Sequence, residues 1–342
     1  MRAEGTPWGR FLVEQMIALP DREHKVLRDT FAAKFTPRYA NQLRPIMREV
    51  MTELLAEWAP RENIDFEEFA SCYPVAVTAR MIGAPLSVIP KLRSSLEALG
   101  LSMSLDASIL PKLDAATELL DGFSRDLVAE RREQPRGAAE PDLLDMLIEA
   151  SNEARNEGGI SDRQLTDLLI FLFVAGYDTS KNVLTYMMHL MVRHPQIYER
   201  CAVDLDYCRS VVEESLRLFS PSTTFRAARE DMIYRDVLIP RDTMLFFTLS
   251  TAGRDAAFAD PHAFEPGRAI APELRHAGFG LGKHMCLGQY IARAQLQEGI
   301  HLIAQAMRRP HAAGEPGWRP FPGVWGIKGL PIAFTHAEAV TA

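Results

Sequence analysis

A single cysteine inside a glycine-rich loop constrains this chain more than any other feature. Residues 276–295 read HAGFGLGKHMCLGQYIARAQ, and Cys286 lies just before a stretch with helical spacing of apolar residues. Four glycines surround it: Gly278, Gly280, Gly282 and Gly288. Glycine loses more conformational freedom on folding than any other residue, so this concentration predicts that the backbone passes close to another group.

Three roles are open to Cys286, and each makes a different demand on its neighbours. A buried structural thiol needs no glycines around it. A catalytic nucleophile needs a histidine base and an orienting partner, and only His284 lies nearby in the sequence. A metal ligand needs further cysteines or histidines at short spacing, unless the metal brings most of its own ligands. The iron of a haem does so, and a flat macrocycle would explain the glycines.

Six residues of this loop have a spacing that resembles the haem-binding loop of the cytochromes P450: Phe279, Gly280, Gly282, His284, Cys286 and Gly288. In that family a cysteine thiolate is the proximal ligand of the haem iron. The resemblance implies haem b (iron protoporphyrin IX) as the cofactor and Cys286 as the iron ligand. It also implies that four neighbours contact the cofactor: Phe279, Gly280, His284 and Gly288. Backbone N–H groups at the start of the following helix are expected to lower the pKa of Cys286.

The sequence EESLR adds a second signal. Glu214 and Arg217 are three residues apart on one helix face, which is the spacing of an ion pair that is most often solvated. Glu213 lies four residues from Arg217, so the spacing also permits that pair. The order of EESLR, FEPGR and the cysteine loop is similar to that of P450s. It implies a buried triad of Glu214, Arg217 and Arg268 that holds the loop beneath the haem.

A long helix is predicted over residues 161–193, and a polar motif interrupts its apolar middle. Ser161 and Gln164 have the spacing of a capping box at its start. Asp178 and Thr179 follow an apolar run, so they either mark the exposed side of the helix or have a function. The segment AGYDTS resembles the distal motif of P450s. This implies that Asp178 and Thr179 are catalytic residues that deliver protons, and that Ala175 and Gly176 contact the cofactor.

Two further sets of residues are assigned by the same resemblance. The haem carboxylates need basic partners, and the resemblance implies His24, Arg28 and Arg226 together with His284. The substrate pocket is expected to be lined by Val174, Thr223, Thr224, Phe225, Trp325 and Ile327. Apolar residues at these positions are equally typical of a core.

The expected fold is mostly α with a small β part, in a single P450-type haem domain over residues 1–342. Helical periodicity dominates the first two-thirds of the chain, including one helix over 39–58. Residues 231–253 predict two strands with a turn at 240–242, and residues 324–334 predict a hairpin at a sheet edge because of Pro331.

The resemblance to P450s runs from about Asp21 to Phe334, and the segment that usually comes first in the family is missing. That segment supplies an initial helix, sheet strands and a cap over the substrate pocket. An N-terminally truncated P450 fold is therefore expected, whether as a fragment, through a misassigned start or naturally. Late strands such as 231–248 are expected to have unpaired edges.

Composition limits the class of protein. The formal net charge of -7 argues against general nucleic-acid binding. Four cysteines without paired spacing fit a reducing cytoplasm, where we expect the protein to be located. The apolar run at 168–176 is too short to cross a membrane, and the first residues do not resemble a signal peptide.

The resemblance implies a bacterial-type soluble P450, a haem-thiolate monooxygenase that inserts one oxygen atom of O2 into a small apolar organic substrate. Electrons are expected from a separate ferredoxin-type donor and its reductase. Two alternatives keep the haem: a truncated haem-binding remnant with little or no activity, and a peroxide-driven peroxygenase, against which Asp178 and Thr179 argue. A hydrolase with Cys286 as its nucleophile is the remaining alternative.

Overall fold

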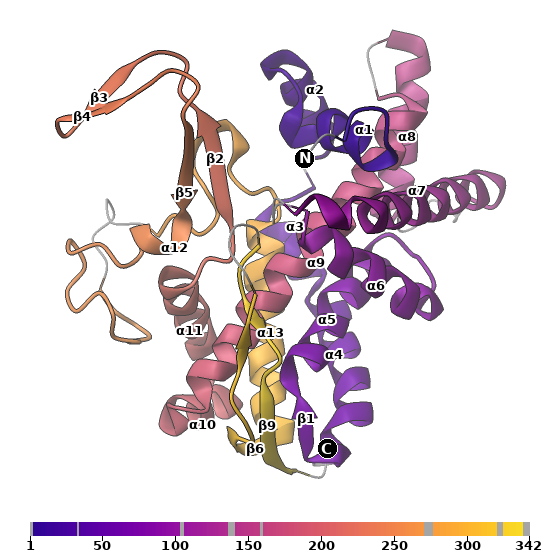
Figure 1. Ribbon diagram of the computed structural model, residues 1–342. Coiled ribbons are helices and arrows are strands. Elements are labelled where there is room, and N and C mark those ends of the chain that lie inside the picture. The colour runs from indigo at the N-terminus through magenta and orange to yellow at the C-terminus, as the bar shows by residue number, and fades with distance from the viewer. Residues whose placement is uncertain are drawn as a thin grey trace.

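Helices make up most of the described structure, as the periodicity of the sequence predicts (Figure 1). The computed structural model describes residues 3–32, 34–102, 106–135, 141–157, 160–269, 276–319 and 324–337. Its α-helices are α1 (Pro7–Glu14), α2 (Asp21–Ala32), α3 (Pro37–Gln42), α4 (Arg44–Trp58), α5 (Phe66–Met81), α6 (Ile89–Gly100), α7 (Leu110–Glu133), α8 (Leu143–Glu157), α9 (Asp162–Met191), α10 (Pro195–Val203), α11 (Leu205–Leu218), α12 (Leu249–Ala252) and α13 (Gln289–Ala306). Among these described helices, none is long and apolar enough to cross a bilayer.

Local chemistry sets where the helices begin. Ser161 and Gln164 form the predicted capping box at the start of α9, each satisfying a backbone N–H that the first turn leaves free. The segment 39–58 is not the single predicted helix, because it divides at Leu43 into α3 and α4. Pro45 explains the division, since proline lacks an N–H and clashes with the preceding turn of a continuous helix.

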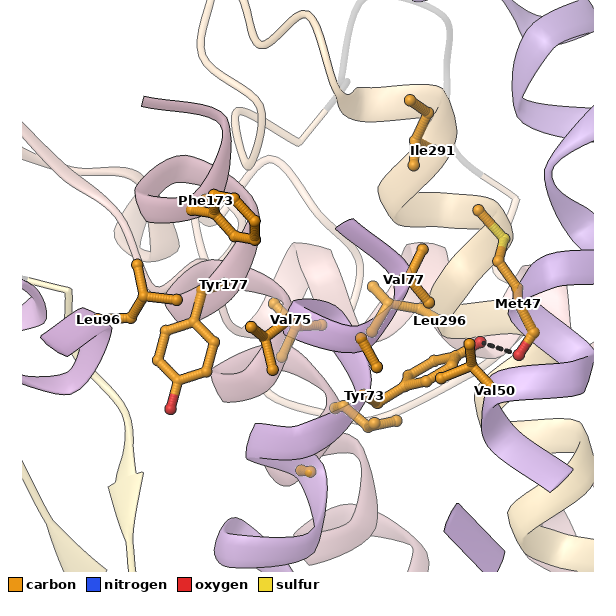
Figure 2. Packing of buried hydrophobic residues seen from close by; sticks show 14 of the residues in the cluster. Met47, Val50, Tyr73, Val75, Val77, Leu96, Phe173, Tyr177, Ile291 and Leu296 are labelled. Atoms are coloured by element: carbon orange, nitrogen blue, oxygen red, sulfur yellow. Dashed lines mark hydrogen bonds between the residues drawn. The ribbon is translucent and has the colours of Figure 1, made fainter. Parts of the chain in front are cut away.

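The core lies where α5 packs between α4, α9 and α13. Figure 2 shows Tyr73 of α5 next to Met47 and Leu296, while Tyr177 of α9 lies on the other side of Val75. The Tyr73 hydroxyl donates a hydrogen bond to the Met47 carbonyl oxygen at 3.2 Å, which satisfies this buried polar group. This packing fixes α9 and α13, the helices that carry or follow the motifs singled out in the sequence.

Short antiparallel strands supply the small β part. They are β1 (Asn63–Asp65), β2 (Thr223–Ala227), β3 (Met232–Tyr234), β4 (Val237–Ile239), β5 (Met244–Thr248), β6 (Met307–Ala312), β7 (Gly317–Trp318), β8 (Ile327–Lys328) and β9 (Pro331–His336). One sheet has the order β1-β9-β6, and β7 pairs with β8. The prediction of an edge hairpin over 324–334 is therefore wrong, because β9 is a central strand. Pro331 is tolerated there as the first residue of the strand.

Two ribbons, β2–β5 and β3–β4, form an arm that extends from the helices (upper left in Figure 1). The predicted turn at 240–242 connects β4 to β5, which do not pair with each other, and the two strands predicted over 231–253 are three in the structure, because the first run folds back on itself as β3 and β4. In the described part of the chain neither β2 nor β5 has a second strand partner, as the expected unpaired edges require. Nine large apolar residues of the arm are between 44% and 76% exposed: Phe225, Met232, Ile233, Tyr234, Val237, Leu238, Met244, Phe246 and Phe247.

Candidate active site

The glycines around Cys286 serve the conformation of the loop in different ways. Gly280 and Gly282 have φ angles of +68° and +72°, which side-chain-bearing residues rarely adopt. A Cβ on Gly278 would lie 3.3 Å from the Leu216 carbonyl oxygen, so this glycine lets the loop approach α11. A Cβ on Gly288 would make only an ordinary contact, 3.9 Å from Cys286 Sγ. Backbone geometry therefore explains two of the four glycines without any bound group.

Cys286 is half-buried at the end of this loop, and α13 (Gln289–Ala306) begins three residues after it. Its backbone N–H donates to the Phe279 carbonyl oxygen at 2.9 Å, which closes the loop. Burial raises the pKa of the Cys286 thiol, although the backbone N–H of Gly288 and the cations Arg28 and Arg293 oppose it. The expectation of a lowered pKa is therefore wrong for the free thiol, because desolvation exceeds the effect of the helix N-terminus.

The predicted triad is present, with Glu214 rather than Glu213 as the acid. Arg217 Nε lies 2.8 Å from Glu214 Oε2, and Arg268 Nε lies 3.3 Å from Glu214 Oε1. Arg217 Nη2 also donates to Glu214 Oε1 at 2.7 Å, and the other three donors of Arg217 reach three backbone carbonyl oxygens: Gly253, Pro261 and Ala263. Since the Arg217 side chain is fully buried, these bonds satisfy all five of its donors and fix the segment that leads to the cysteine loop.

Glu213 instead joins α11 to the two ends of the cysteine loop. It accepts hydrogen bonds from Arg293 Nε at 2.6 Å and from His276 Nε2 at 3.0 Å. The Arg293 guanidinium lies 4.3 Å from the centre of the Phe279 ring. Burial would raise the pKa of Glu213, but His276 and Arg293 outweigh it and lower the pKa to about 2. Glu213 is a residue that the motif left without a role.

Two imidazoles lie side by side next to the cysteine loop. The ring centres of His24 and His284 are 4.3 Å apart, as the resemblance to P450s implies for partners of one group. His24 Nε2 and His284 Nδ1 are buried and have no hydrogen-bond partner among the described residues. Burial, followed by the charges of Arg28 and Lys283, lowers the pKa of His24. Unsatisfied donors surrounded by cations fit an anion, so the residues present fit the carboxylates of a haem.

The other predicted basic residues surround this imidazole pair. Arg28 Nη2 donates to the Met285 carbonyl oxygen at 2.6 Å, which ties α2 to the loop. Arg226 on β2 donates to the Phe225 carbonyl oxygen at 2.7 Å. After burial, the charges of His24, Lys283, Arg226 and Arg28 lower the pKa of His284, so Arg226 lies within electrostatic reach. The structure thus brings His24, Arg28, Arg226 and His284 together.

One face of α9 is open in the middle of an otherwise buried helix. Ala175 is exposed, and Val174, Gly176 and Thr179 are half-buried, whereas every residue from Ser180 to Met191 is buried. Thr179 Oγ1 donates to the Ala175 carbonyl oxygen at 2.8 Å, so its hydroxyl lies at this opening. Because α9 exposes Ala175 while the residues that follow Thr179 are buried, space is left beside this part of the helix. The sequence predicts that the cofactor lies in that space.

Asp178 points away from solvent and lies among charged side chains. Arg319 Nη1 lies 2.8 Å from Asp178 Oδ1 and 2.7 Å from Oδ2, and Lys181 Nζ lies 3.2 Å from Oδ1. Glu67 Oε1 lies 2.9 Å from Lys181 Nζ. The alternative that Asp178 marks the exposed side of the helix is wrong, because the residue is 3% exposed. We call Glu67, Asp178, Lys181 and Arg319 the distal cluster.

Three members of the distal cluster were missed in the sequence. Lys181 follows Asp178 by three residues inside an apolar helix, a spacing that could have revealed it. Glu67 reads as an ordinary acidic residue in the first turn of α5, which favours negative charge there for local reasons. Arg319 lies 141 residues from Asp178, so no local pattern indicates their contact.

The predicted pocket residues divide into two groups. Thr223 and Thr224 are half-buried, and Phe225 on β2 is exposed. The Trp325 ring stacks on Trp318 with 5.2 Å between centres, and its backbone N–H donates to the Pro221 carbonyl oxygen just before β2. Ile327 is 0% exposed in β8, so it belongs to the core, and its assignment to the pocket is wrong.

Comparison with known proteins agrees with these observations. The family model described as Cytochrome P450 matches residues 101–308, more than half of the chain. A luteothin monooxygenase of Streptomyces thioluteus is 30% identical over 343 residues, covering 97% of this chain and 82% of that protein. Cytochrome P450 109 of Bacillus spizizenii is 28% identical over 333 residues, covering 94% and 80%.

Solved structures give the same result. A myxobacterial cytochrome P450 in complex with myristic acid superposes with a TM-score of 0.85 at 26% identity, covering 98% of this chain and 82% of that chain. P450s act on an organic substrate and O2 with electrons from a redox partner. The predictions of fold and family are confirmed. The chain belongs to the cytochrome P450 family, and it is a haem-dependent monooxygenase.

Proposed function

We propose that this protein inserts one oxygen atom of O2 into a small apolar organic substrate, with haem b held between α9 and the Cys286 loop. The observation that carries the proposal is the pair of buried, unpartnered imidazole nitrogens of His24 and His284 beside that loop. The chain acts as a single haem domain, because one cluster of buried apolar residues includes side chains from α1 to β9.

Each part of the site has a separate role in this proposal. Cys286 would hold the haem iron through its sulfur, and the triad of Glu214, Arg217 and Arg268 holds its loop in place. The haem carboxylates are bound by His24, Arg28, Arg226 and His284, whose charges and free donors are suited to them. The haem would also be in contact with Ala175, Gly176, Phe279, Gly280 and Gly288.

When bound, a thiolate-ligated haem supplies the redox chemistry that cleaves the O–O bond of dioxygen. The chain supplies the protons. The Thr179 hydroxyl lies at the opening in α9 and passes a proton from its Oγ1, while Asp178 provides the proton from its carboxyl group.

The lining of the opening favours an apolar substrate. Val174, Ala175, Thr223, Thr224, Phe225 and Trp325 contribute mostly apolar surface. The complex of a similar P450 with myristic acid supports this class of ligand. Electrons come from a ferredoxin-type donor with its reductase. Lys283, whose side chain is 56% exposed, offers a cation near the loop, although it pairs with Asp21.

The assignment of Cys286 is tested by the absorption spectrum of the reduced protein with carbon monoxide. The wild-type protein is expected to show the strongly red-shifted Soret band of an iron–thiolate centre, and Cys286→Ala is expected to lose it. Cys72→Ala is the matched control, since Cys72 is a half-buried cysteine on α5 that contacts none of these residues. A red-shifted band that persists in Cys286→Ala would show that another residue ligates the iron.

A further inference from the structure

The distal cluster contains a lysine, Lys181, that is buried away from solvent. The Lys181 side chain is 0% exposed, and lysine is almost never fully buried unless an acidic group pairs with it. Two carboxylates pair with it here, Glu67 at 2.9 Å and Asp178 at 3.2 Å. Lys181 thus bridges the proposed catalytic acid to a second acid on a different helix.

The second acid leads to the surface. Glu67 Oε2 lies 3.3 Å from Lys328 Nζ, and the Lys328 side chain is 53% exposed. Asp178, Lys181, Glu67 and Lys328 therefore form an unbroken series of charged contacts from the interior to solvent. Its members come from three elements: Asp178 and Lys181 from α9, Glu67 from α5 and Lys328 from β8.

The contacts of Lys181 are close but poorly aligned. Lys181 Nζ and Glu67 Oε1 lie within ion-pair distance, yet neither atom has a well-directed hydrogen bond. Arg319 differs, because its Nη1 makes two short hydrogen bonds to Asp178. Arg319 therefore holds the acid in place, while the Lys181 ammonium can turn between its two carboxylates.

We propose that Lys181 and Glu67 form a proton-supply route that links Asp178 to solvent at Lys328. The inference rests on the proposed function, in which Asp178 is the proton donor. Such a route requires a lysine rather than an arginine at position 181, since an ammonium can lose a proton whereas a guanidinium does not. Arg319 is a positioning residue that acts through Asp178.

The route conserves protons and charge. The Lys181 ammonium gives a proton to the Asp178 carboxylate, which leaves a neutral amine and a neutral carboxyl group. The Lys328 ammonium gives a proton to the Glu67 carboxylate, and the Glu67 carboxyl group passes it to the Lys181 amine. Lys328 then takes a proton from water. One proton has moved from solvent to Asp178, and no electron or heavy atom has moved.

The sharpest test is Lys181→Arg in the haem-loaded protein, because arginine keeps the charge and both ion pairs but does not release a proton. Oxygen consumption is measured with a ferredoxin, its reductase and NADPH, without organic substrate, in H2O and in D2O. Lys181→Arg is expected to slow oxygen consumption about tenfold and to increase the solvent isotope effect. Arg48→Lys is the matched control, a change at the remote buried acid Glu298, and it is expected to leave both quantities unchanged.

A second variant covers the case in which arginine does not fit. Glu67→Gln with Lys181→Met removes one negative and one positive charge, so the cluster stays balanced while the route is interrupted, and the same slowing is expected. Wild-type rates and isotope effects in both variants would overturn the route. A slow Asp178→Asn protein beside a normal Lys181→Arg protein would overturn the route alone. A normal Asp178→Asn protein would overturn the role of Asp178 in the proposed function.

A measurement without turnover adds an independent result. In the reduced carbon monoxide complex labelled with 15N-lysine, NMR reports how fast the Lys181 ammonium protons exchange with water. Exchange is expected to be measurable in the wild type despite complete burial, and to slow in Glu67→Gln. Exchange that is equally fast in Glu67→Gln would show that protons reach Lys181 without Glu67.

Discussion

Two buried networks of charged residues lie on either side of the proposed haem position, and they are built differently. In the proximal triad, Arg217 directs five donors to Glu214 and to three backbone carbonyl oxygens. In the distal cluster, Lys181 lies between two carboxylates without a well-aligned hydrogen bond. The triad is bonded to backbone carbonyl oxygens, whereas the distal cluster contacts a surface residue, Lys328.

This difference separates two uses of buried charge. Arginine stays protonated and presents a rigid fork, so a network made with it fixes the backbone around it. Lysine and carboxylates can exchange protons, so a network made with them can change its charge state without unfolding. Both kinds of network are costly to bury. Fixing the backbone is a sufficient reason to bury the arginine network, whereas burial of the lysine network calls for a further function.

The largest expected effect comes from the conservative change Arg217→Lys. Lysine cannot reach the five partners of the guanidinium, which leaves buried carbonyl oxygens and Glu214 without donors. The free energy of unfolding is expected to fall by more than about 3 kcal/mol. The matched change Arg319→Lys loses one bidentate contact and is expected to cost only about 1 kcal/mol. Urea unfolding of the two variants tests this, and equal losses would remove the contrast between the networks.

Lowering the pH should change the free energy of unfolding through Glu67, a member of the distal cluster. Burial alone would raise the pKa of Glu67, but Lys181 and Lys328 outweigh it and lower the pKa below 4.5. A lowered carboxyl pKa contributes stability above the unfolded value, and this contribution is lost as the pH falls below about 4.5 through the folded pKa. In Lys181→Met, burial dominates and the pKa of Glu67 shifts above its unfolded value, so the contribution of Glu67 to the free energy of unfolding is expected to rise, not fall, as the pH is lowered. Urea unfolding across this range measures the shift, and unchanged pH profiles would contradict it.

The smallest expected effect is at the surface end of the distal cluster. Lys328 is half exposed, so Lys328→Ala is expected to reduce the free energy of unfolding by less than about 1 kcal/mol. Water can take over its place as proton donor to Glu67, so oxygen consumption is expected to change less than about twofold. A loss as large as that of Lys181→Arg would show that the ammonium of Lys328 itself is required.

Local patterns predicted the residues that stand close together in the chain. The capping box at Ser161, the Glu214–Arg217 pair and the cysteine loop all follow from short spacings that the structure preserves. Strand pairing was predicted poorly, because β9 pairs with β1 across more than 260 residues and no local pattern carries that information. Pro331 indicated an edge strand, because the sequence does not show that this proline is the first residue of its strand.

The site was predictable only as far as the family motif extends. The motif assigned Asp178 but not Arg319, which reaches it from the other end of the chain. The motif also implied that Ile327 faces the pocket, whereas β8 places it in the core. Burial and partner choice depend on tertiary packing, so the charged residues around a motif are less predictable than the motif itself.

Two glycines limit how this part of the protein can diverge. Gly100 ends α6 with its α-carbon facing the distal cluster, and a Cβ there would lie 2.4 Å from Asp178 Oδ2. A Cβ on Gly326 would lie 1.8 Å from Asn182 Oδ1, next to Asp178. Every substitution of glycine adds that atom, so neither position can vary in sequence as freely as a helix end or a loop ordinarily does. In descendants of this sequence, both positions should change only together with the charges that they enclose.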